Sequence, residues 1–191
     1  MRTFNEELNQ HIAVMQLARQ CSESVEAAAD LLMTTFQNGN KLLLCGNGGS
    51  AADAQHIAAE FVVRYEQKRR ALPAIALTTD SSILTAHAND FDFDSVFARQ
   101  IEALGNAGDT LIAISTSGNS KNVIHAAQVA RDKNLNVIAL TGESGGALIN
   151  IATLTITVPS SVTARIQETH ILIGHYWCGV VEERLNVSES A

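Results

Sequence analysis

The sequence has few of the residues that cross-link a small secreted fold or divide a chain into segments. Three cysteines occur among 191 residues. They are widely spaced and form no C-x-x-C motif, which excludes a disulfide framework, so we expect reduced thiols in a cytoplasmic protein. There are only two prolines, and no serine- or glycine-rich linker or internal repeat is present. We therefore expect residues 1–191 to form a single domain.

Long apolar runs and an excess of positive charge are also missing. No apolar stretch approaches the roughly 18 residues that a membrane-spanning helix needs, and the first residues do not resemble a signal peptide. Thirteen Lys and Arg against twenty Asp and Glu give a formal net charge of −7, which disfavours binding to nucleic acid. Apolar residues make up 46% and charged residues 17%, a composition that excludes intrinsic disorder.

Short apolar runs alternate with helical patterns along most of the chain. The first forty residues have apolar side chains at helical spacing, in two stretches that end near Gly39. Five apolar runs follow at 41–45, 73–78, 110–115, 136–140 and 154–158, with helical patterns at 51–65, 123–130 and 162–185. This alternation predicts a doubly wound α/β domain, with a five-stranded parallel sheet and extra helices at both ends.

Two polar loops follow predicted strands and precede predicted helices. They are Gly46–Ser50, which is rich in glycine, and Ser115–Ser120, which is rich in hydroxyl groups. Backbone N–H groups and hydroxyls at the start of a helix favour an anion, and glycine lets the backbone approach a ligand closely. Either loop alone is equally well explained as a turn with a helix cap. Two such loops at one sheet edge favour a phosphate site, although neither matches a nucleotide-binding signature.

Four polar side chains on predicted helices add further chemistry. His56 and Glu60 are four residues apart and share a helix face, while Gln167 and His175 are eight apart on the last helix. In isolation, such a pair is more often a polar surface pair. If these helices reach the phosphate loops, the side chains can hold a divalent ion such as zinc, or the carboxylate and an imidazole can move protons. The spacing alone leaves these alternatives open.

Five separated motifs resemble the sugar isomerase (SIS) domain family and, within it, the phosphoheptose isomerases. In chain order they are Cys45–Ser50, Asp53–His56, Asn89–Asp90, Ser115–Ser120 and Arg165–Glu168. The resemblance covers nearly the whole chain. It implies a flavodoxin-like sheet, a phosphosugar substrate and a homotetramer with active sites between subunits.

The resemblance also implies a role for each matching residue. Glu60 and His175 match the catalytic proton-transfer pair, and His56, Glu60, Gln167 and His175 match the ligands of one zinc ion per subunit. The residues that match substrate-binding positions are Asn47, Gly48, Gly49, Ser50, Glu60, Asn89, Asp90, Ser115, Thr116, Ser117, Ser120 and Gln167. The implied reaction converts sedoheptulose 7-phosphate to D-glycero-D-manno-heptose 7-phosphate through an enediol(ate), for lipopolysaccharide heptose synthesis.

Two other functions are compatible with the same loops. One branch of the family is a noncatalytic tetrameric scaffold that binds the bacterial replication initiator, and a phosphosugar sensor would bind its ligand without turning it over. In the scaffold branch, the positions that match Glu60 and His175 carry side chains unable to move protons, so both residues favour the isomerase. Some of these isomerases carry Asp where this chain has Ala164, so a supporting carboxylate is absent here.

Three further features receive structural interpretations. The basic cluster Lys68–Arg70 is interpreted as a solvated loop. Tyr176 and Trp177 on the last helix are predicted to pack an oligomer interface. Cys45, at a predicted strand end, is interpreted as a small buried residue rather than a nucleophile.

Overall fold

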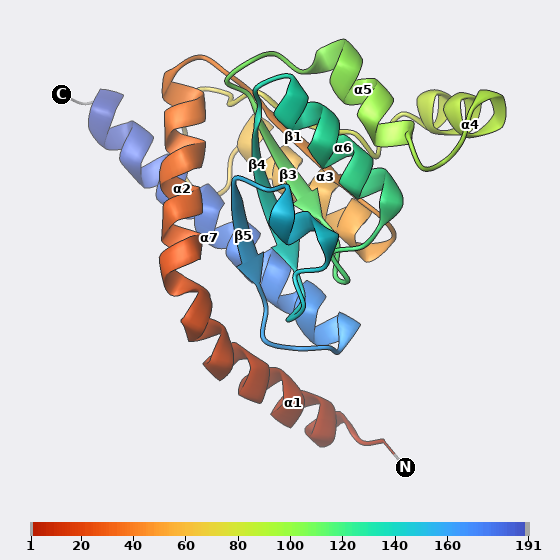
Figure 1. Cartoon of the computed structure of the whole chain (residues 1–191). Coiled ribbons are helices and arrows are strands. Elements are labelled where there is room, and N and C mark those ends of the chain that lie inside the picture. The colour runs from red at the N-terminus through yellow and green to blue at the C-terminus, as the bar shows by residue number, and fades with distance from the viewer. Residues whose placement is uncertain (1, 190–191) are drawn as a thin grey trace.

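A parallel sheet lies between two layers of helices in the computed structural model, which describes residues 2–189 (Figure 1). The strands are β1 (Leu42–Gly46), β2 (Ala74–Ala76), β3 (Thr110–Ile114), β4 (Asn136–Thr141) and β5 (Leu154–Thr157). All neighbouring strands are parallel, in the order β2-β1-β3-β4-β5. This confirms the predicted five-stranded, doubly wound α/β fold. In the part of the chain described, no helix is both long enough and apolar enough to cross a membrane.

The helices differ from the sequence prediction mainly between β2 and β3. The α-helices are α1 (Phe4–Leu17), α2 (Ser22–Gln37), α3 (Gly49–Val62), α4 (Ser81–Asp90), α5 (Val96–Leu104), α6 (Lys121–Asp132) and α7 (Thr163–Glu189). Two short 3₁₀ helices, η1 (Ala18–Cys21) and η2 (Ala147–Asn150), complete the fold. The prediction omitted α4 and α5. Helix α4 buries none of its residues and so has no apolar pattern to detect, whereas α5 has a buried face that the prediction missed.

Alternate residues of the central strands pack against opposite helical layers. Leu42 and Leu44 of β1 face the layer of α2, α3 and α7, whereas Leu43 and Cys45 face the layer of α5 and α6. Strand neighbours point to opposite faces of a sheet, so burial on both faces produces a continuous apolar run. Cys45 is fully buried, as interpreted from the sequence, and burial raises the pKa of its thiol to about 12.

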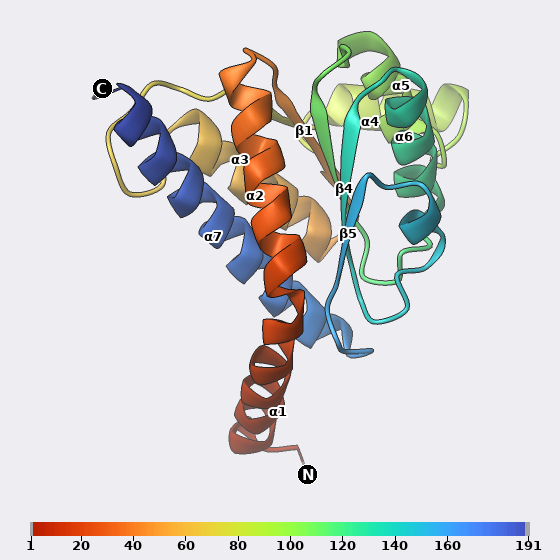
Figure 2. The same cartoon turned by 60° about the vertical axis from the view of Figure 1, so that its left-hand side comes forward.

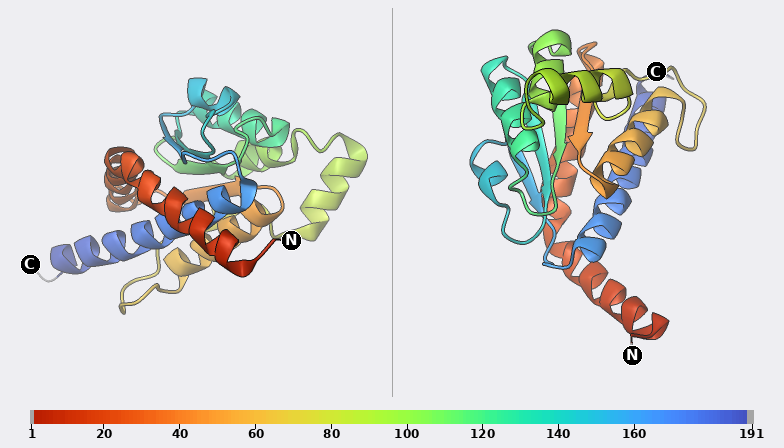
Figure 3. Two further views of the ribbon diagram at one scale, coloured as in Figure 1. Left: turned by 90° about the horizontal axis from the view of Figure 1, so that it is seen from below. Right: turned by 90° about the vertical axis from the view of Figure 1, so that its right-hand side faces the viewer.

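Two helices extend from this body and bury no residue within the chain. Helix α1 runs downward past the sheet in Figure 2, and α4 projects to one side in the left view of Figure 3. Helix α1 begins with a capping box, in which Thr3 Oγ1 accepts from the Glu6 backbone N–H at 3.2 Å and Glu6 Oε2 accepts from the Thr3 backbone N–H at 2.7 Å. Local capping thus stabilises the start of a helix that buries none of its residues.

Two structural interpretations of the sequence are wrong for one residue each, Trp177 and Arg69, while Lys68 and Arg70 are exposed as interpreted. Trp177 is fully buried inside the domain, where its Nε1 donates to the Val25 carbonyl oxygen at 3.0 Å, so it does not pack an oligomer interface. The side chain of Arg69 is also completely buried, as one half of an ion pair with Glu182. A short basic cluster in a loop is usually solvated, and only the partner on α7, more than a hundred residues away, reverses that expectation.

Candidate functional site

The two polar loops lie side by side at the carboxyl edge of the sheet. Strands β1 and β3 are neighbours, with Gly46 in register with Ile114, and the loops Gly46–Ser50 and Ser115–Ser120 leave their carboxyl ends. Successive strands are added on one side of β1 and then on the other. In open α/β sheets, ligands bind at such a switch point.

The first loop depends on glycine for its path into α3. A Cβ at Gly46 would lie 2.8 Å from both the Cβ and the carbonyl oxygen of Ser50, so any larger residue would push the strand and helix apart. Gly48 precedes α3 with φ of 56°, a left-handed conformation that glycine adopts without strain. The path that these two glycines allow brings the start of α3 to the sheet edge, where an anion is favoured.

The second loop gathers hydroxyl groups at the start of α6. Ser115 Oγ lies 2.9 Å from Ser120 Oγ and 3.5 Å from Ser117 Oγ. Ser120 is the N-cap residue of α6, yet its side chain makes no capping hydrogen bond, so its hydroxyl is turned towards the other serines. Thr116 lines an adjoining pocket of about 260 Å³ together with Ser117 and Asn119. The cluster offers several hydroxyl donors, and the hydrogen bonds described for these hydroxyls involve no Lys or Arg side chain.

An amide pair joins the first loop to the start of α6. One of its members, Asn122, was not predicted from the sequence. Asn47 Nδ2 donates to Asn122 Oδ1 at 2.9 Å, and Asn122 Nδ2 donates back to Asn47 Oδ1 at the same distance. Asn122 is buried in the first turn of α6. These reciprocal bonds fix the orientation of the Asn47 amide.

Helices α3 and α7 run side by side and in the same direction, away from the loop end of the sheet (Figures 2 and 3). The amide of Gln167 lies against Gly49 at the start of α3, where a Cβ would come within 2.5 Å of Gln167 Nε2. Two turns further on, a Cβ at Gly174 would lie 2.5 Å from Ile57 Cδ1. Glycine at these two points allows the helices to approach closely exactly where site residues meet.

Three of the four predicted metal ligands, including the acid–base pair, meet between these helices. His56 Nε2 lies 3.1 Å from Glu60 Oε1 and 3.5 Å from His175 Nε2. The two imidazole rings meet edge to face, with centroids 5.0 Å apart. Among the described residues, no group of three or more His, Cys, Asp or Glu side chains is already arranged to hold a metal ion. The described contacts of Gln167 are with Gly49, at the loop end of the helix pair.

Asp53, one turn before His56, is a second residue for which spacing gave no role. Its Oδ2 atom is buried and has no hydrogen-bond partner. Burial raises the pKa of the Asp53 carboxyl, and the nearby imidazoles of His56 and His175 partly oppose that rise. A buried carboxylate oxygen without a donor favours positive charge on its neighbours. The signals in the sequence were its place in the Asp53–His56 motif and its spacing of three from His56.

Two predicted substrate contacts lie away from this cluster. Asn89 and Asp90 end α4, are exposed, and contact each other through a 2.8 Å bond from Asn89 Nδ2 to Asp90 Oδ1. Helix α4 packs chiefly on α5, on the far side of the sheet from α7. The fold of one chain therefore does not bring these two residues to the loops.

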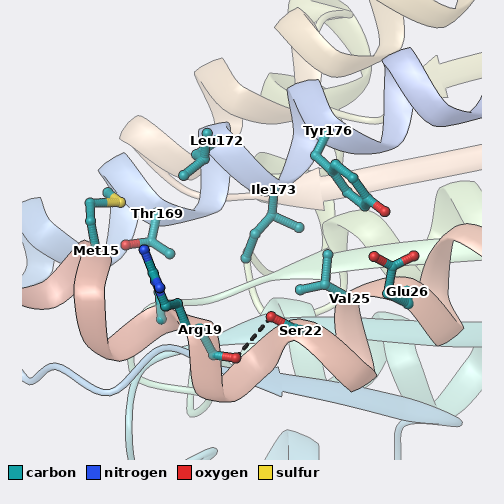
Figure 4. Close-up of a pocket in the computed structure, with 10 residues that line it drawn as sticks. Met15, Arg19, Ser22, Val25, Glu26, Thr169, Leu172, Ile173 and Tyr176 are labelled. Carbon is teal, nitrogen blue, oxygen red and sulfur yellow. Dashed lines mark hydrogen bonds between the residues drawn. The ribbon is translucent and has the colours of Figure 1, made fainter.

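A groove of about 310 Å³ lies elsewhere, between α7 and the junction of α1 with α2 (Figure 4). Met15, Val25, Leu172 and Ile173 give it a largely apolar lining. It contains none of the predicted site residues, and its few polar groups include a bond from Ser22 Oγ to the Arg19 carbonyl oxygen. This groove therefore lies outside the candidate site.

The sheet order, the switch-point loops and the long last helix define an α/β domain of the sugar isomerase type, and the SIS domain model matches residues 4–142. A phosphoheptose isomerase from Aliarcobacter butzleri is 55% identical over 164 residues, which cover 86% of this chain and 87% of that protein. One from Citrifermentans bemidjiense is 52% identical, with 95% of each chain covered. The solved phosphoheptose isomerase from Neisseria gonorrhoeae superposes with a TM-score of 0.88 at 45% identity, over 94% of this chain and 96% of that one. The chain therefore belongs to the phosphoheptose isomerase family of SIS domain proteins.

Proposed function

We propose that this protein is a ketose–aldose isomerase that converts sedoheptulose 7-phosphate to D-glycero-D-manno-heptose 7-phosphate. The observation that carries the proposal is the meeting of Glu60 and His175 around His56, next to a hydroxyl-rich loop at a helix start. A scaffold or a sensor needs the loop but has no use for the acid–base pair. The relatives named above are enzymes, which supports the isomerase over both alternatives.

The phosphate end of the substrate binds at the start of α6. Ser115, Ser117 and Ser120 donate hydroxyl hydrogen bonds to phosphate oxygens, with Thr116 at the rim, and the N-terminal dipole of α6 favours the negative charge. On the other side, Gly48 and Gly49 supply backbone N–H groups at the start of α3, and Ser50, whose own N–H donates to the Asn47 carbonyl oxygen at 3.0 Å, contributes its hydroxyl. The Asn47 amide, held by Asn122, faces the sugar.

The reaction moves a proton between two adjacent carbons. Glu60 removes the proton from C1 of the ketose, which gives an enediol(ate) with negative charge on the C2 oxygen. His175 moves the proton of the C1 hydroxyl to the C2 oxygen, and the proton that Glu60 took from C1 is delivered to C2, which completes the aldose. Hydrogen-bond donors from Asn47 or the backbone stabilise the oxyanion.

We further propose one zinc ion per subunit, held by His56, Glu60, Gln167 and His175. Two imidazoles, a carboxylate and an amide oxygen are suitable zinc donors, and donors around a tetrahedral zinc ion lie about 3.3 Å apart. The separations of 3.1 and 3.5 Å among His56, Glu60 and His175 are of that size. The unpartnered Asp53 oxygen adds negative charge nearby. When bound, the ion would polarise the carbonyl end of the sugar.

We also propose a homotetramer in the cytoplasm, acting in lipopolysaccharide heptose synthesis. Helices α1 and α4 bury nothing in one chain, while Phe4, Leu8, Phe91 and Phe93 on or beside them are exposed. Exposed apolar surface of this kind favours contact with further copies, which would bring Asn89 and Asp90 to a neighbour's sugar. Three buried, unpaired cysteines support a reducing compartment.

Turnover of sedoheptulose 7-phosphate by the purified protein tests the function directly. The assay is run with added zinc, after chelation, and after zinc is restored, and the mass in solution is measured alongside. We expect turnover that chelation removes and zinc restores. Absence of turnover with zinc supplied would contradict the proposed function, and turnover unaffected by chelation would contradict the metal.

A further inference from the structure

The segment that follows α3 returns to α7 and contacts it on the same face as His175. Three positions of α7 take part, His175, Gly179 and Glu182, which are four and three residues apart and so share a face. The contacting segment runs from Tyr65 to Arg69, immediately after the helix that carries Glu60. None of the five sequence motifs includes Tyr65, Arg69 or Glu182.

Glu182 fastens the backbone of this segment to α7. Its side chain is buried and accepts backbone N–H bonds from Tyr65 at 2.7 Å and from Glu66 and Gln67 at 2.9 Å each. Burial alone would raise the pKa of the Glu182 carboxyl, but these donors and the Arg69 guanidinium lower it overall. Glu182 is therefore a buried carboxylate whose charge is used to hold a turn of main chain.

Arg69 links the same carboxylate to the end of α3. Its Nε lies 3.2 Å from Glu182 Oε1, while Nη2 donates to the Glu60 carbonyl oxygen at 2.7 Å and Nη1 to that of Phe61 at 2.8 Å. The last carbonyls of a helix have no partner within the helix. Arg69 supplies one, so the turn of α3 that bears Glu60 is tied directly to α7.

The held segment presents Tyr65 to His175. The two rings stack with centroids 5.5 Å apart and an interplanar angle of 22°. Gly179 lies beside the same ring, and a Cβ there would be 3.6 Å from it, an ordinary van der Waals contact. His175 therefore stacks on Tyr65 and meets His56 in a T-shaped contact, and these two contacts favour this orientation of its ring.

We propose that Tyr65 is a positioning residue for His175, and that Glu182 and Arg69 hold it in place. The proposal rests on the proposed function, because it concerns the orientation of the proposed proton-transfer pair. A buried ion pair is in general a weak source of stability, whereas proton transfer requires the two groups to lie within hydrogen-bond reach of the substrate. A misplacement of about 1 Å can reduce a rate by about 10²-fold.

Matched substitutions at Tyr65 provide the test. Tyr65→Phe keeps the stacked ring and Tyr65→Leu removes it, and Tyr65→Met gives a second ring-free variant should the Leu protein be unstable. Tyr176→Leu, one residue beyond His175 on another face of α7, is the control. We expect kcat to fall by about 10–100-fold in Tyr65→Leu while KM for sedoheptulose 7-phosphate changes by less than about twofold. Tyr65→Phe should retain a kcat close to that of the wild type.

The two hypotheses fail in different ways. A wild-type protein without turnover contradicts the proposed function. Wild-type turnover together with a normal kcat in Tyr65→Leu overturns the positioning role alone. The positioning role is also overturned if kcat falls equally in Tyr65→Phe and Tyr65→Leu, or falls similarly in Tyr176→Leu, because the loss would then not depend on the stacked ring. A change confined to KM overturns it as well, because it would show a role in binding and not in proton transfer.

Discussion

The loop end and the helix end of the candidate site are held together in different ways. At the loop end, glycines and serines within each short segment determine its path, and Ser115, Ser117 and Ser120 approach one another within six residues. At the helix end, His56 and His175 approach from positions 119 residues apart. Only the packing of α3 on α7 brings them together. A phosphate cradle can thus be a local structure, whereas an acid–base pair depends on the whole domain.

This difference predicts that the two ends affect different kinetic constants. Losses at the loop end should weaken binding of the phosphate and appear in KM. Losses at the helix end should slow proton transfer and appear in kcat. The following substitutions test that separation, beginning with the largest expected effect.

Removal of either proton-transfer group should have the largest effect. Glu60→Gln and His175→Gln should each lower kcat by about 10²–10⁴-fold, because neither amide side chain can accept the proton at neutral pH. Steady-state kinetics measures the loss, and circular dichroism checks the fold. Glu102→Gln, an exposed carboxylate on α5, is the matched control. A fall that appeared only in KM would contradict the division between the two ends.

Loss of a phosphate-binding hydroxyl should have the next largest effect, and a different signature. Ser120→Ala should raise KM by about 10–100-fold, since a hydrogen bond to a charged group contributes about 1.5–3 kcal/mol, and leave kcat nearly unchanged. Ser24→Ala on α2, which also removes a hydroxyl, serves as the comparison. A Ser120→Ala protein with normal KM and reduced kcat would show that the loop end acts in the chemistry.

Gly49→Ala should affect both ends of the site, because Gly49 lies in the first loop and contacts Gln167, a proposed zinc ligand. The added methyl would lie 2.5 Å from Gln167 Nε2, so the amide has to leave the start of α3. We expect zinc affinity, measured by chelator competition, to fall about tenfold, as is typical when the surroundings of a metal ligand change. Unchanged zinc affinity with raised KM would assign Gln167 to the sugar rather than to the metal.

Acid should lower the stability of the folded domain through His170, without changing either kinetic constant near neutrality. His170 is fully buried on α7, with Nε2 donating to the Thr141 carbonyl oxygen at 3.1 Å and Nδ1 unpartnered. Burial lowers its pKa from 6.5 to about 4, so the unfolded chain binds a proton in this window and the folded chain does not. The free energy of unfolding should fall by about 3 kcal/mol as pH drops from about 6.5 to about 4.

Urea unfolding at several pH values measures this dependence. The same series on His170→Gln should lose most of the slope between pH 6.5 and 4, because the substituted side chain does not titrate. An equal slope in both proteins would assign the acid sensitivity to other groups.

Much of the fold could be predicted because a strand that is buried on both faces of the sheet has a continuous apolar sequence. Leu42–Gly46 and Thr110–Ile114 are buried throughout, and such strands read as apolar runs of the right length. Helix α4 has no apolar face in its sequence from which it could be predicted, since none of its residues is buried. The burial of Arg69 was missed for a related reason, since its partner Glu182 lies far away in the chain. A charged side chain looks solvated until its partner is known.

The sequence by itself determined the strands, the two glycine- and serine-containing loops and the types of donor available at the site. These follow from short-range rules: the period of apolar residues, the φ angles that glycine permits and the hydroxyls near a helix start. The tertiary structure alone decided that His175 reaches His56, that Asn122 holds Asn47 and that Glu182 binds the turn bearing Tyr65. Each of these contacts joins residues more than seventy positions apart, and the distance between such residues is set by how helices pack rather than by their spacing in the chain.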